Sequence, residues 1–347
     1  MLFTIAISIY NGTNELIDMI NSLLSQSKND NFEILLLNDG STNKETVEIC
    51  ENFSEKYPNV RLFSQEDLGL CSARNTSLKL SKSKYILFLD QDDLLYSCAI
   101  QNITTILEGV EYDIVTFGYD VNTYNDKKEI VKKVEYRTDN IEILGELAIF
   151  NYFGENVGGV VNPVWNKAYR VSFLKDNKLW FNEDLKMSLD DFEFNIRAFY
   201  VAKSVFFADF IGYHYVYSLN SSSRKFRIEL FRQSMEIFAD YLTKLKLRKI
   251  FMNSVESKFY QYFFALSIMR MYENISFSND DLETKIYNIN YILSDKNVIN
   301  QLKIIEDKDI LNGKWSKWLL KLSLNKNVKL IINSFLIKKK YINFKSR

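Results

Sequence analysis

The sequence predicts an α/β fold with an open, mostly parallel sheet and helices on both of its faces. Strand and helix patterns alternate over residues 1–120, the strand runs are apolar along most of their length, and polar turn formers follow the first two runs. Continuous apolar runs are typical of strands covered on both faces, and alternation with helices is typical of parallel strands. These observations together predict a doubly covered sheet.

Each element of this fold is predicted from its own pattern. The expected strands are short apolar runs, namely Phe3–Ile9, Glu33–Leu37, Asn59–Ser64, Tyr85–Leu89 and Tyr112–Phe117. The expected helices have apolar residues at three- and four-residue spacing and cover Leu16–Leu24, a segment around Cys50, and Ala73–Leu80. Ser41 or Thr42 is expected to cap the helix around Cys50, because a hydroxyl oxygen accepts hydrogen bonds from free helix amides.

The rest of the chain changes character. Residues 121–225 are rich in aromatic residues and mix strand and helix patterns, whereas helical periodicity dominates from Phe226 to the end. No linker rich in Gly, Ser or Pro separates these regions. We therefore expect three parts, residues 1–120, 121–225 and 226–347.

Composition argues against several classes of protein. The 347 residues include 44 basic and 44 acidic side chains, a balance unlike the basic footprint of a nucleic-acid-binding protein. The three cysteines form no Cys-x-x-Cys pair, which indicates free thiols and not disulfides or a zinc site. No basic segment precedes the apolar start, and no run reaches the ~18 apolar residues of a membrane span. We expect a soluble, cytoplasmic chain.

Polar clusters follow three of the expected strands. They are Tyr10-Asn11, Asn38-Asp39-Gly40-Ser41 and Asp90-Gln91-Asp92-Asp93. In open parallel sheets, ligands bind beyond the carboxyl ends of the strands, so these clusters are expected to meet at one ligand-binding edge. An ordinary turn remains the alternative for each of them taken alone.

The third cluster is the most specific, because it brings three carboxylates into four residues. Such acids repel one another unless a cation or hydrogen-bond donors neutralise them. Mg2+ and Mn2+ prefer oxygen ligands and commonly take one or two carboxylates together with phosphate oxygens. The cluster therefore predicts a divalent metal site, with a solvated acidic loop before a helix near Ala99 as the alternative.

Four short motifs in this region resemble glycosyltransferase family 2, whose members have the GT-A fold. They are Ile7-Ser8-Ile9-Tyr10-Asn11, Asn38-Asp39-Gly40-Ser41-Thr42, Gly69-Leu70-Cys71-Ser72-Ala73-Arg74-Asn75 and Tyr85-Ile86-Leu87-Phe88-Leu89-Asp90-Gln91-Asp92-Asp93. Their order and spacing over residues 4–120 carry the resemblance. It implies a Rossmann-like GT-A sheet and an enzyme of the bacterial surface-polysaccharide type, which transfers a sugar from a nucleotide diphosphate.

The resemblance implies a donor site in residues 1–120. Tyr10 would lie against the nucleobase and Asp39 would accept a hydrogen bond from it, which favours uracil because a carboxylate pairs well with an imide N–H. Asp92 would bind Mn2+ or Mg2+, and Asp90 would lie nearer the ribose and the metal's waters. The metal would neutralise the charge that builds on the departing diphosphate.

Three further residues complete the implied donor site. Asn11 and Gln91 belong to the matched motifs. Arg74 would lie near the diphosphate or brace the carboxylates, with a surface salt bridge as the alternative.

The resemblance extends to the acceptor side, in residues 121–225. Asp190-Asp191 resembles the family's Glu-Asp motif with Asp190 in place of Glu. Asp191 would then be the catalytic base that takes the proton from the acceptor hydroxyl, and a single base opposite the leaving group gives inversion. The alternative is that both acids cap the helix expected over Phe192–Ala202, and the two roles are compatible.

Three residues are weaker candidates on the acceptor side or just behind it. Trp165 and Lys167 lie in a segment that resembles the family's Trp-x-Lys-x-Tyr-Arg motif, although Trp165 would fit equally well in a core. His214 is the only histidine and lies in a Tyr-His-Tyr sequence that resembles the end of the family's catalytic domain. A lone histidine is more often a hydrogen-bonded structural residue.

The last 38 residues contain ten Lys or Arg and no acid. Trp315, Trp318, Leu319 and Leu322 fall at helical spacing beside lysines. A basic amphipathic helix with tryptophans predicts binding to an anionic membrane surface, on the inner face of the cell membrane. The alternative is a helix packed on the protein with a solvated basic face.

Two hypotheses of function follow. The first is an inverting, metal-dependent glycosyltransferase that uses a UDP-sugar and a glycan or lipid-linked acceptor in cell-surface polysaccharide synthesis. The second is a non-catalytic scaffold that binds nucleotide sugar and serves another glycosyltransferase. Intact Asp92 and Asp191 favour the first. A dinucleotide-binding or P-loop enzyme is excluded, because the chain has neither G-x-G-x-x-G nor G-x-x-x-x-G-K-[ST].

Overall fold

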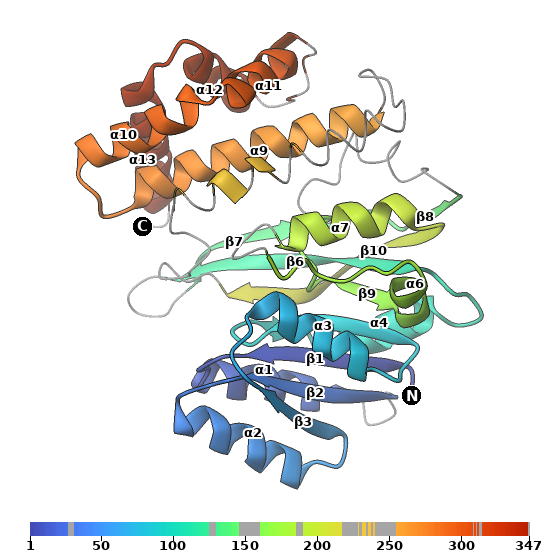
Figure 1. Ribbon diagram of the computed structural model, residues 1–347. Helices are drawn as coiled ribbons and strands as arrows, with labels where there is room; N and C mark the ends of the chain where they lie inside the picture. Colours follow the sequence, from blue (N-terminus) through green and yellow to red (C-terminus); the bar gives the residue numbers. More distant parts are fainter. Residues whose placement is uncertain are drawn as a thin grey trace. The chain divides into compact units, whose positions relative to one another are not determined.

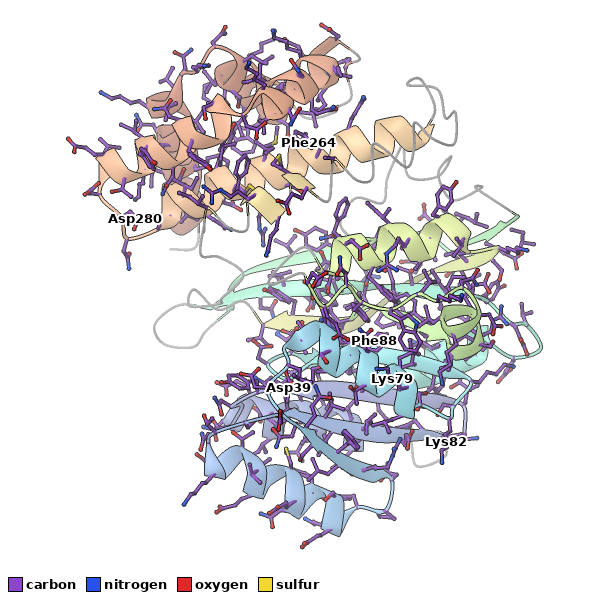
Figure 2. All side chains as sticks on the ribbon, viewed as in Figure 1. Asp39, Lys79, Lys82, Phe88, Phe264 and Asp280 are labelled. Carbon is purple, nitrogen blue, oxygen red and sulfur yellow. The ribbon has the colours of Figure 1, made fainter. Side chains whose placement is uncertain are left out.

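The computed structural model describes two compact units, residues 1–217 and 218–347. The described residues are 1–26, 31–124, 130–145, 160–184, 190–216, 255–307 and 314–345, with positions 228, 231–233, 235, 236, 239, 309 and 311. Figure 1 shows a sheet with flanking helices in the first unit and a group of helices in the second. Figure 2 labels Phe88 and Phe264, each about 1% exposed, in the cores of the first and second units.

The first unit is built on one mixed sheet, which has ten strands among the described residues. The strands are β1 (Phe3–Ile9), β2 (Phe32–Asp39), β3 (Val60–Gln65), β4 (Tyr85–Asp90), β5 (Leu94–Leu95), β6 (Ile114–Tyr124), β7 (Ile130–Tyr136), β8 (Ile141–Leu144), β9 (Lys167–Arg170) and β10 (Ser204–Val216). Their order is β3-β2-β1-β4-β9-β6-β10-β5, with β7 beside β6 and β8 beside β10.

Strand direction divides this sheet. β1 to β4 are mutually parallel, and β6 and β10 run the same way. β5, β7, β8 and β9 run in the opposite direction, so the sheet is less uniformly parallel than the prediction. One of these four, β9, is a short strand that lies between β4 and β6 and pairs antiparallel to both.

The helices of the first unit confirm the predicted alternation. They are α1 (Asn14–Leu24), α2 (Lys44–Lys56), α3 (Leu70–Leu80), α4 (Ala99–Ile106), α6 (Val171–Asp176) and α7 (Asp190–Val201). The predicted cap of α2 is wrong. Asn43 caps this helix by accepting a hydrogen bond from the Glu45 N–H at 3.0 Å, because Ser41 and Thr42 lie in the preceding turn and bond to Asn11.

The described part of the second unit is helical, as predicted for the end of the chain. Its helices are α9 (Val255–Phe277), α10 (Leu282–Ser294), α11 (Lys296–Asp307), α12 (Lys314–Leu324) and α13 (Val328–Lys345). The prediction for residues 240–254 lies outside the described residues. Among the helices that are described, none combines the length and the apolar character that crossing a membrane requires.

The order of the parallel strands determines where a ligand can bind. β1 lies between β2 and β4, so the connections after β1 and β2 diverge from those after β4. Figure 2 shows that Asp39, at the carboxyl end of β2, and Lys82, just before β4, lie at opposite ends of the strands. The carboxyl edge is therefore the expected ligand edge of this sheet.

Candidate active site

The carboxyl ends of three neighbouring strands form the candidate active site. β1 pairs in parallel with both β2 and β4, with Ile9 opposite Asn38 and Ser8 opposite Asp90. The chain therefore leaves β1 at Tyr10 between the ends of the other two strands. The structure thus brings the three predicted polar clusters together at one edge.

Gln91 attaches the turn after β4 to the segment after β1. Its side-chain amide accepts a hydrogen bond from the Tyr10 N–H at 3.1 Å and donates one to the Tyr10 carbonyl at 3.0 Å. A Cβ on Gly12 would meet the Gln91 side chain at 2.4 Å, so glycine keeps room for this amide. The Tyr10 side chain is 46% exposed. Gln91 therefore holds the backbone of Tyr10 in place while the ring faces solvent.

Asn11 joins the loop after β1 to the loop after β2. Its φ of +53° is a left-handed conformation that asparagine tolerates better than most residues. Its N–H donates to the Ser41 hydroxyl at 3.0 Å, and its Oδ1 accepts from the N–H groups of Thr42 and Asn43, both at 2.9 Å. Asn11 is therefore first a loop-closing residue, with its side-chain oxygen engaged by the protein.

Asp39 is buried and directs most of its carboxylate to the protein. Its Oδ1 accepts from the Gln65 amide at 2.7 Å and from the Leu68 N–H at 3.2 Å, and its Oδ2 accepts from the Gly69 N–H at 2.9 Å. A carboxylate has about four lone-pair sites, so one site on Oδ2 remains for a ligand. Asp39 fixes the approach to α3 and keeps limited capacity to read a nucleobase.

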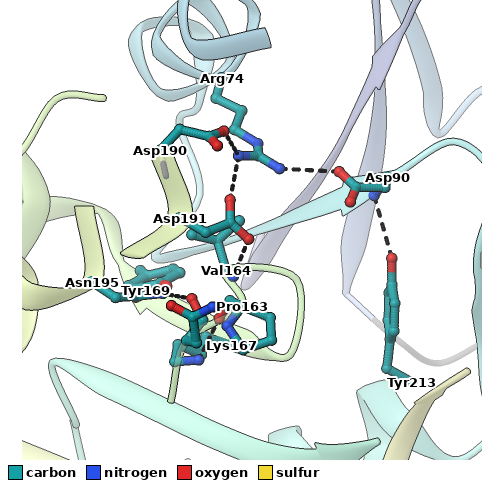
Figure 3. A network of polar contacts seen from close by, with 11 residues as sticks. Arg74, Asp90, Pro163, Val164, Lys167, Tyr169, Asp190, Asp191, Asn195 and Tyr213 are labelled. Atoms are coloured by element: carbon teal, nitrogen blue, oxygen red, sulfur yellow. Dashed lines mark hydrogen bonds and ion pairs between the residues drawn. The ribbon is translucent and has the colours of Figure 1, made fainter. Parts of the chain in front are cut away.

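Arg74 joins carboxylates from two distant segments, as Figure 3 shows. Its guanidinium donates to Asp90 at 3.0 Å, to Asp190 at 2.8 Å and to Asp191 at 2.7 Å. Asp90 ends β4, whereas Asp190 and Asp191 begin α7. The Arg74 side chain is only 2% exposed, so this is a buried brace and not a surface salt bridge. One guanidinium thus brings both halves of the predicted site together.

Negative charge exceeds positive charge around this guanidinium. Burial raises the pKa of Asp90 to about 7; Arg74 opposes the rise and the neighbouring aspartates add to it. Burial also raises the pKa of Asp190, with Asp191 as a second cause. Burial would lower the pKa of Arg74, but its three carboxylate partners raise it instead. This balance favours the binding of a further cation at the site.

The acids of the turn after β4 have different surroundings. Asp92 is exposed, whereas Asp93 is buried and accepts hydrogen bonds from the Tyr213 hydroxyl and the Val216 N–H, both at 2.8 Å. Arg74 contacts Oδ1 of Asp90, which leaves Oδ2. Asp92 and Asp90 therefore offer the oxygen atoms that Mg2+ or Mn2+ prefers, and the residues fit such an ion.

The residues fit a metal ion that the protein binds only in part, with phosphate oxygens and water as its other ligands. Across the described residues, no group of three or more His, Cys, Asp or Glu side chains is arranged to hold a metal ion. Mg2+ commonly binds through one or two carboxylates together with phosphate oxygens and water.

Asp191 lies in the first turn of α7 and is held at both carboxylate oxygens. Oδ1 accepts from Arg74, and Oδ2 accepts from the Val164 N–H at 3.1 Å. The side chain is 20% exposed, and each oxygen keeps a lone pair. Asp191 is therefore fixed in position yet can still accept a proton from a ligand.

Lys167 and Trp165 lie in the same segment as Val164, whose N–H donates to Asp191. The Lys167 ammonium is fully buried and donates to the Val160 carbonyl at 2.8 Å, to the Asn166 side chain at 2.8 Å, and to the Pro163 carbonyl. An ammonium with three oxygen acceptors has all its donors satisfied. Lys167 thus folds the segment that carries the Val164 N–H and does not face a ligand.

The Trp165 side chain is part of an aromatic group. It stacks on Tyr213 with ring centroids 4.3 Å apart and on Tyr215 at 5.7 Å, and it meets the edge of Tyr119 at 4.6 Å. Its exposed fraction is only 7%. Trp165 therefore packs in the core, as the alternative interpretation of this residue expects.

His214 is buried beside a buried acid. Its Nδ1 lies 2.5 Å from Oδ1 of Asp120, whose Oδ2 accepts from the Tyr96 hydroxyl at 2.6 Å and from Lys133 at 3.0 Å. Burial alone would raise the pKa of Asp120. The hydrogen bonds from Tyr96, His214 and Lys133 act in the opposite direction, and the pKa is lowered overall. His214 thus belongs to a hydrogen-bonded network that links β10 to β6, to β7 and to Tyr96, which directly follows β5.

Three residues of the site were not predicted as site residues. Asn75, next to Arg74, exchanges hydrogen bonds with the backbone of Phe181 at 2.7 and 2.9 Å and donates to Glu183 at 2.8 Å. Asp93 and Tyr213 form the bonded pair described above. Asn75 and Asp93 lie inside the matched motifs, and Tyr213 lies inside the Tyr-His-Tyr sequence. The motifs therefore included these residues, but their residue types did not indicate which contacts they make.

Comparison with known proteins gives a consistent family. Residues 4–175 match the model of Glycosyl transferase family 2. The chain is 31% identical over 213 residues to the uncharacterized glycosyltransferase EpsJ of Bacillus subtilis, a match that covers 59% of this chain and 58% of EpsJ. The chain thus spans less than two thirds of the length of that relative.

Two further matches cover more of the chain. It is 25% identical over 305 residues to a cholesterol galactosyltransferase of Borreliella burgdorferi, which covers 86% of this chain and 80% of that one. Its fold is similar to a crystal structure of S. aureus TarS 1-349 in complex with UDP-GlcNAc, with a TM-score of 0.59, 18% identity, and coverage of 98% and 92%.

Proposed function

We propose that this chain, which belongs to glycosyl transferase family 2 over residues 4–175, is a glycosyltransferase that uses a nucleotide diphosphate sugar, with a divalent metal and with inversion. The observation that carries the proposal is the Arg74 guanidinium, which bonds Asp90 at the donor edge and Asp191 at the start of α7. A metal-binding edge and a base must lie on either side of one sugar, and this contact holds the two within reach of each other.

The donor in this proposal is a UDP-sugar. TarS binds UDP-GlcNAc on a similar fold. In this chain, the exposed ring of Tyr10 provides a flat surface for the base, and the remaining lone pair of Asp39 Oδ2 can accept the uracil N–H. Asn11 and Gln91 support donor binding indirectly. Their side chains hydrogen-bond to backbone groups of the loops that carry Tyr10 and the acidic turn.

Asp92 and Asp90 would hold Mn2+ or Mg2+ together with the donor's phosphates. Such an ion neutralises negative charge on the departing diphosphate, which is its contribution to the reaction. Asp92 provides the exposed carboxylate, and Asp90 provides the oxygen that Arg74 leaves. Arg74 braces the carboxylates, the second of the two roles that the resemblance allows.

Asp191 is the base in this proposal. The acceptor hydroxyl attacks the anomeric carbon, the bond from that carbon to the diphosphate oxygen breaks, and the hydroxyl proton passes to Asp191. Arg74 and the Val164 N–H fix the carboxylate before the acceptor arrives. A single attack from the face opposite the diphosphate inverts the anomeric configuration. Asp190 stabilises Arg74 and does not need to touch the acceptor.

The acceptor in this proposal is a glycan or a lipid-linked molecule that is used in the synthesis of a cell-surface polysaccharide. The cholesterol galactosyltransferase, whose match extends beyond the family domain, supports an acceptor with a lipid part. A non-catalytic scaffold is the competing function. The presence of Asp92, together with an Asp191 that Arg74 holds in place, supports catalysis over a scaffold role.

A donor panel tests the proposal. Purified chain is incubated with UDP-sugars and with GDP-sugars as controls, in Mn2+ and in excess chelator, and nucleoside diphosphate release is measured. We expect release from a UDP-sugar that chelation abolishes and Mn2+ restores. Release that is unaffected by chelator would contradict the metal proposal. Binding of the nucleotide sugar without any release, in the presence of candidate acceptors, would favour the scaffold.

A peripheral membrane contact is part of the proposed setting. Trp315 packs against Phe335 with ring centroids 5.1 Å apart, and Leu319 and Leu322 are buried, so most of the predicted apolar stripe of α12 faces the interior of its own unit. Trp318 remains 45% exposed, and the lysines at 314, 321 and 329 are exposed as well. An exposed tryptophan among lysines supports contact with anionic lipid.

This contact is tested with vesicles and point variants, because removing α12 would also remove buried residues. Wild type should sediment with phosphatidylglycerol vesicles and not with phosphatidylcholine vesicles. Trp318→Ser with Lys314→Gln and Lys321→Gln should reduce sedimentation several-fold at an unchanged melting temperature. Equal sedimentation of both proteins would reject this surface.

A further inference from the structure

We propose that Asp93 and Tyr213 are positioning residues, which together fix the turn that carries Asp90 and Asp92. The inference rests on the proposed function, because it concerns the same metal and donor site. It assigns the third acid of the turn a task different from that of its neighbours. Neither residue is expected to touch the metal or the donor.

The contacts of Asp93 use both of its oxygens inside the protein. Oδ2 accepts from the Tyr213 hydroxyl and Oδ1 accepts from the Val216 N–H, both at 2.8 Å. The side chain is 1% exposed. A hard cation needs oxygen atoms that it can reach together with water or phosphate, so a buried carboxylate bonded at both ends is poorly suited to be a ligand.

The Tyr213 hydroxyl closes the turn from inside. It donates to Asp93 at 2.8 Å and accepts from the backbone N–H of Asp90 at 3.4 Å. One oxygen atom thus contacts the first and the last residue of Asp90-Gln91-Asp92-Asp93. β10 also pairs with β5 just beyond this turn, with Tyr213 opposite Leu95. The turn is thereby held at both of its ends, with the exposed Asp92 between the two contacts.

The ring of Tyr213 connects this turn to the segment behind the proposed base. It stacks on Trp165 with centroids 4.3 Å apart and an interplanar angle of 13°. Trp165 directly follows Val164, whose N–H donates to Asp191. Tyr213 therefore lies between the part of the site that binds the donor and the part that holds the base. Removing the hydroxyl alone keeps this stack and breaks only the contacts with the turn.

Tyr85 offers a matched control within the same sheet. It is also fully buried, and its hydroxyl donates to the Tyr112 carbonyl at 3.0 Å and accepts from the Tyr112 N–H at 3.1 Å. It begins β4, whereas the acidic turn follows the other end of that strand. Tyr85→Phe therefore removes a hydroxyl group and two hydrogen bonds, as Tyr213→Phe does, but at a position remote from the acidic turn.

The test compares Tyr213→Phe, Asp93→Asn and their double variant with Tyr85→Phe. Each protein is measured for melting temperature, for kcat/KM with the best UDP-sugar, and for the Mn2+ concentration that gives half-maximal rate. We expect Tyr213→Phe and Asp93→Asn each to lower kcat/KM about tenfold or more and to raise the Mn2+ requirement. The double variant should lose less than the two single effects combined, because the two residues share one hydrogen bond.

Three results would overturn the proposal. The first is that Tyr213→Phe and Tyr85→Phe have the same kcat/KM, the same Mn2+ requirement and a similar loss of melting temperature. The Tyr213 hydroxyl would then contribute to stability alone. A strong effect of Asp93→Asn with a silent Tyr213→Phe would make Asp93 a ligand in its own right. Additive effects in the double variant would separate the two residues. A wild type that is inactive with every UDP-sugar would instead reject the proposed function itself.

Discussion

Two pairs of adjacent aspartates lie at the candidate site, Asp92 and Asp93 after β4 and Asp190 and Asp191 at the start of α7. In each pair one side chain is buried and bonded within the protein, and its neighbour is more open. Asp93 is 1% exposed beside an exposed Asp92, and the side chain of Asp190 is 6% exposed beside Asp191 at 20%.

This difference explains how a loop and a helix end can each present a carboxylate precisely enough for chemistry. Asp93 anchors the turn to β10, and Asp190 anchors the start of α7 to Arg74. Anchors that are bonded and buried limit the motion of the neighbouring acid, a requirement for preorganised sites. The open member of each pair should then govern the reaction, and the buried member should govern geometry and stability.

The largest effect is expected from Asp191→Asn. An amide cannot take the acceptor proton, and general-base catalysis typically contributes about 10²–10⁴-fold. We expect transfer to fall about 10³-fold while the KM for the donor stays within a few-fold, measured by UDP release and by direct donor binding. Glu193→Gln is the control, because Glu193 lies on the same helix and pairs with Arg197 at 2.6 Å. Transfer near the wild-type rate in Asp191→Asn would remove the base assignment.

The next effect is expected from Asp92→Asn. Losing a charged oxygen ligand should raise the Mn2+ needed for half-maximal rate by at least about 10–100-fold, because losing even a hydrogen-bond partner of a metal ligand has an effect of that size. Glu15→Gln is the control for the loss of a nearby negative charge, because Glu15 is exposed and its charge raises the pKa of Asp92. An unchanged Mn2+ titration would show that Asp92 does not hold the metal.

A smaller effect on rate and a clear effect on stability are expected from Asp190→Asn. The substitution weakens a buried, charge-assisted hydrogen bond to Arg74, and such bonds contribute about 1.5–3 kcal/mol. We expect the free energy of unfolding in urea to fall by about that amount and the rate to fall about tenfold. A rate loss as large as that of Asp191→Asn would contradict the division into anchor and open acid.

Local patterns predicted most of the fold and the elements of the site. β1, β2 and β4 follow from continuous apolar runs, and the polar residues at their ends belong where parallel strands finish. β9 could not be predicted, because its four residues carry no period and its place between β4 and β6 depends on long-range pairing.

The division of labour within the acid pairs was also beyond the sequence. Asp92 and Asp93 are identical side chains in adjacent positions, and only the approach of β10 makes one of them buried. Likewise, Lys167 is fully buried, and three oxygen atoms of its own segment accept hydrogen bonds from its side-chain nitrogen. The chemistry of a residue type is readable from sequence, whereas its direction depends on partners far along the chain.

The most direct measurement is a crystal structure of this chain with UDP and Mn2+, with the metal located by its anomalous scattering. We predict a Mn2+ peak bonded to the carboxylate of Asp92 and to the diphosphate, the uracil ring on Tyr10, and Asp191 facing the same cavity. A nucleotide bound away from the ends of β1, β2 and β4, or a Mn2+ peak far from Asp92 and Asp90, would contradict the proposed active site.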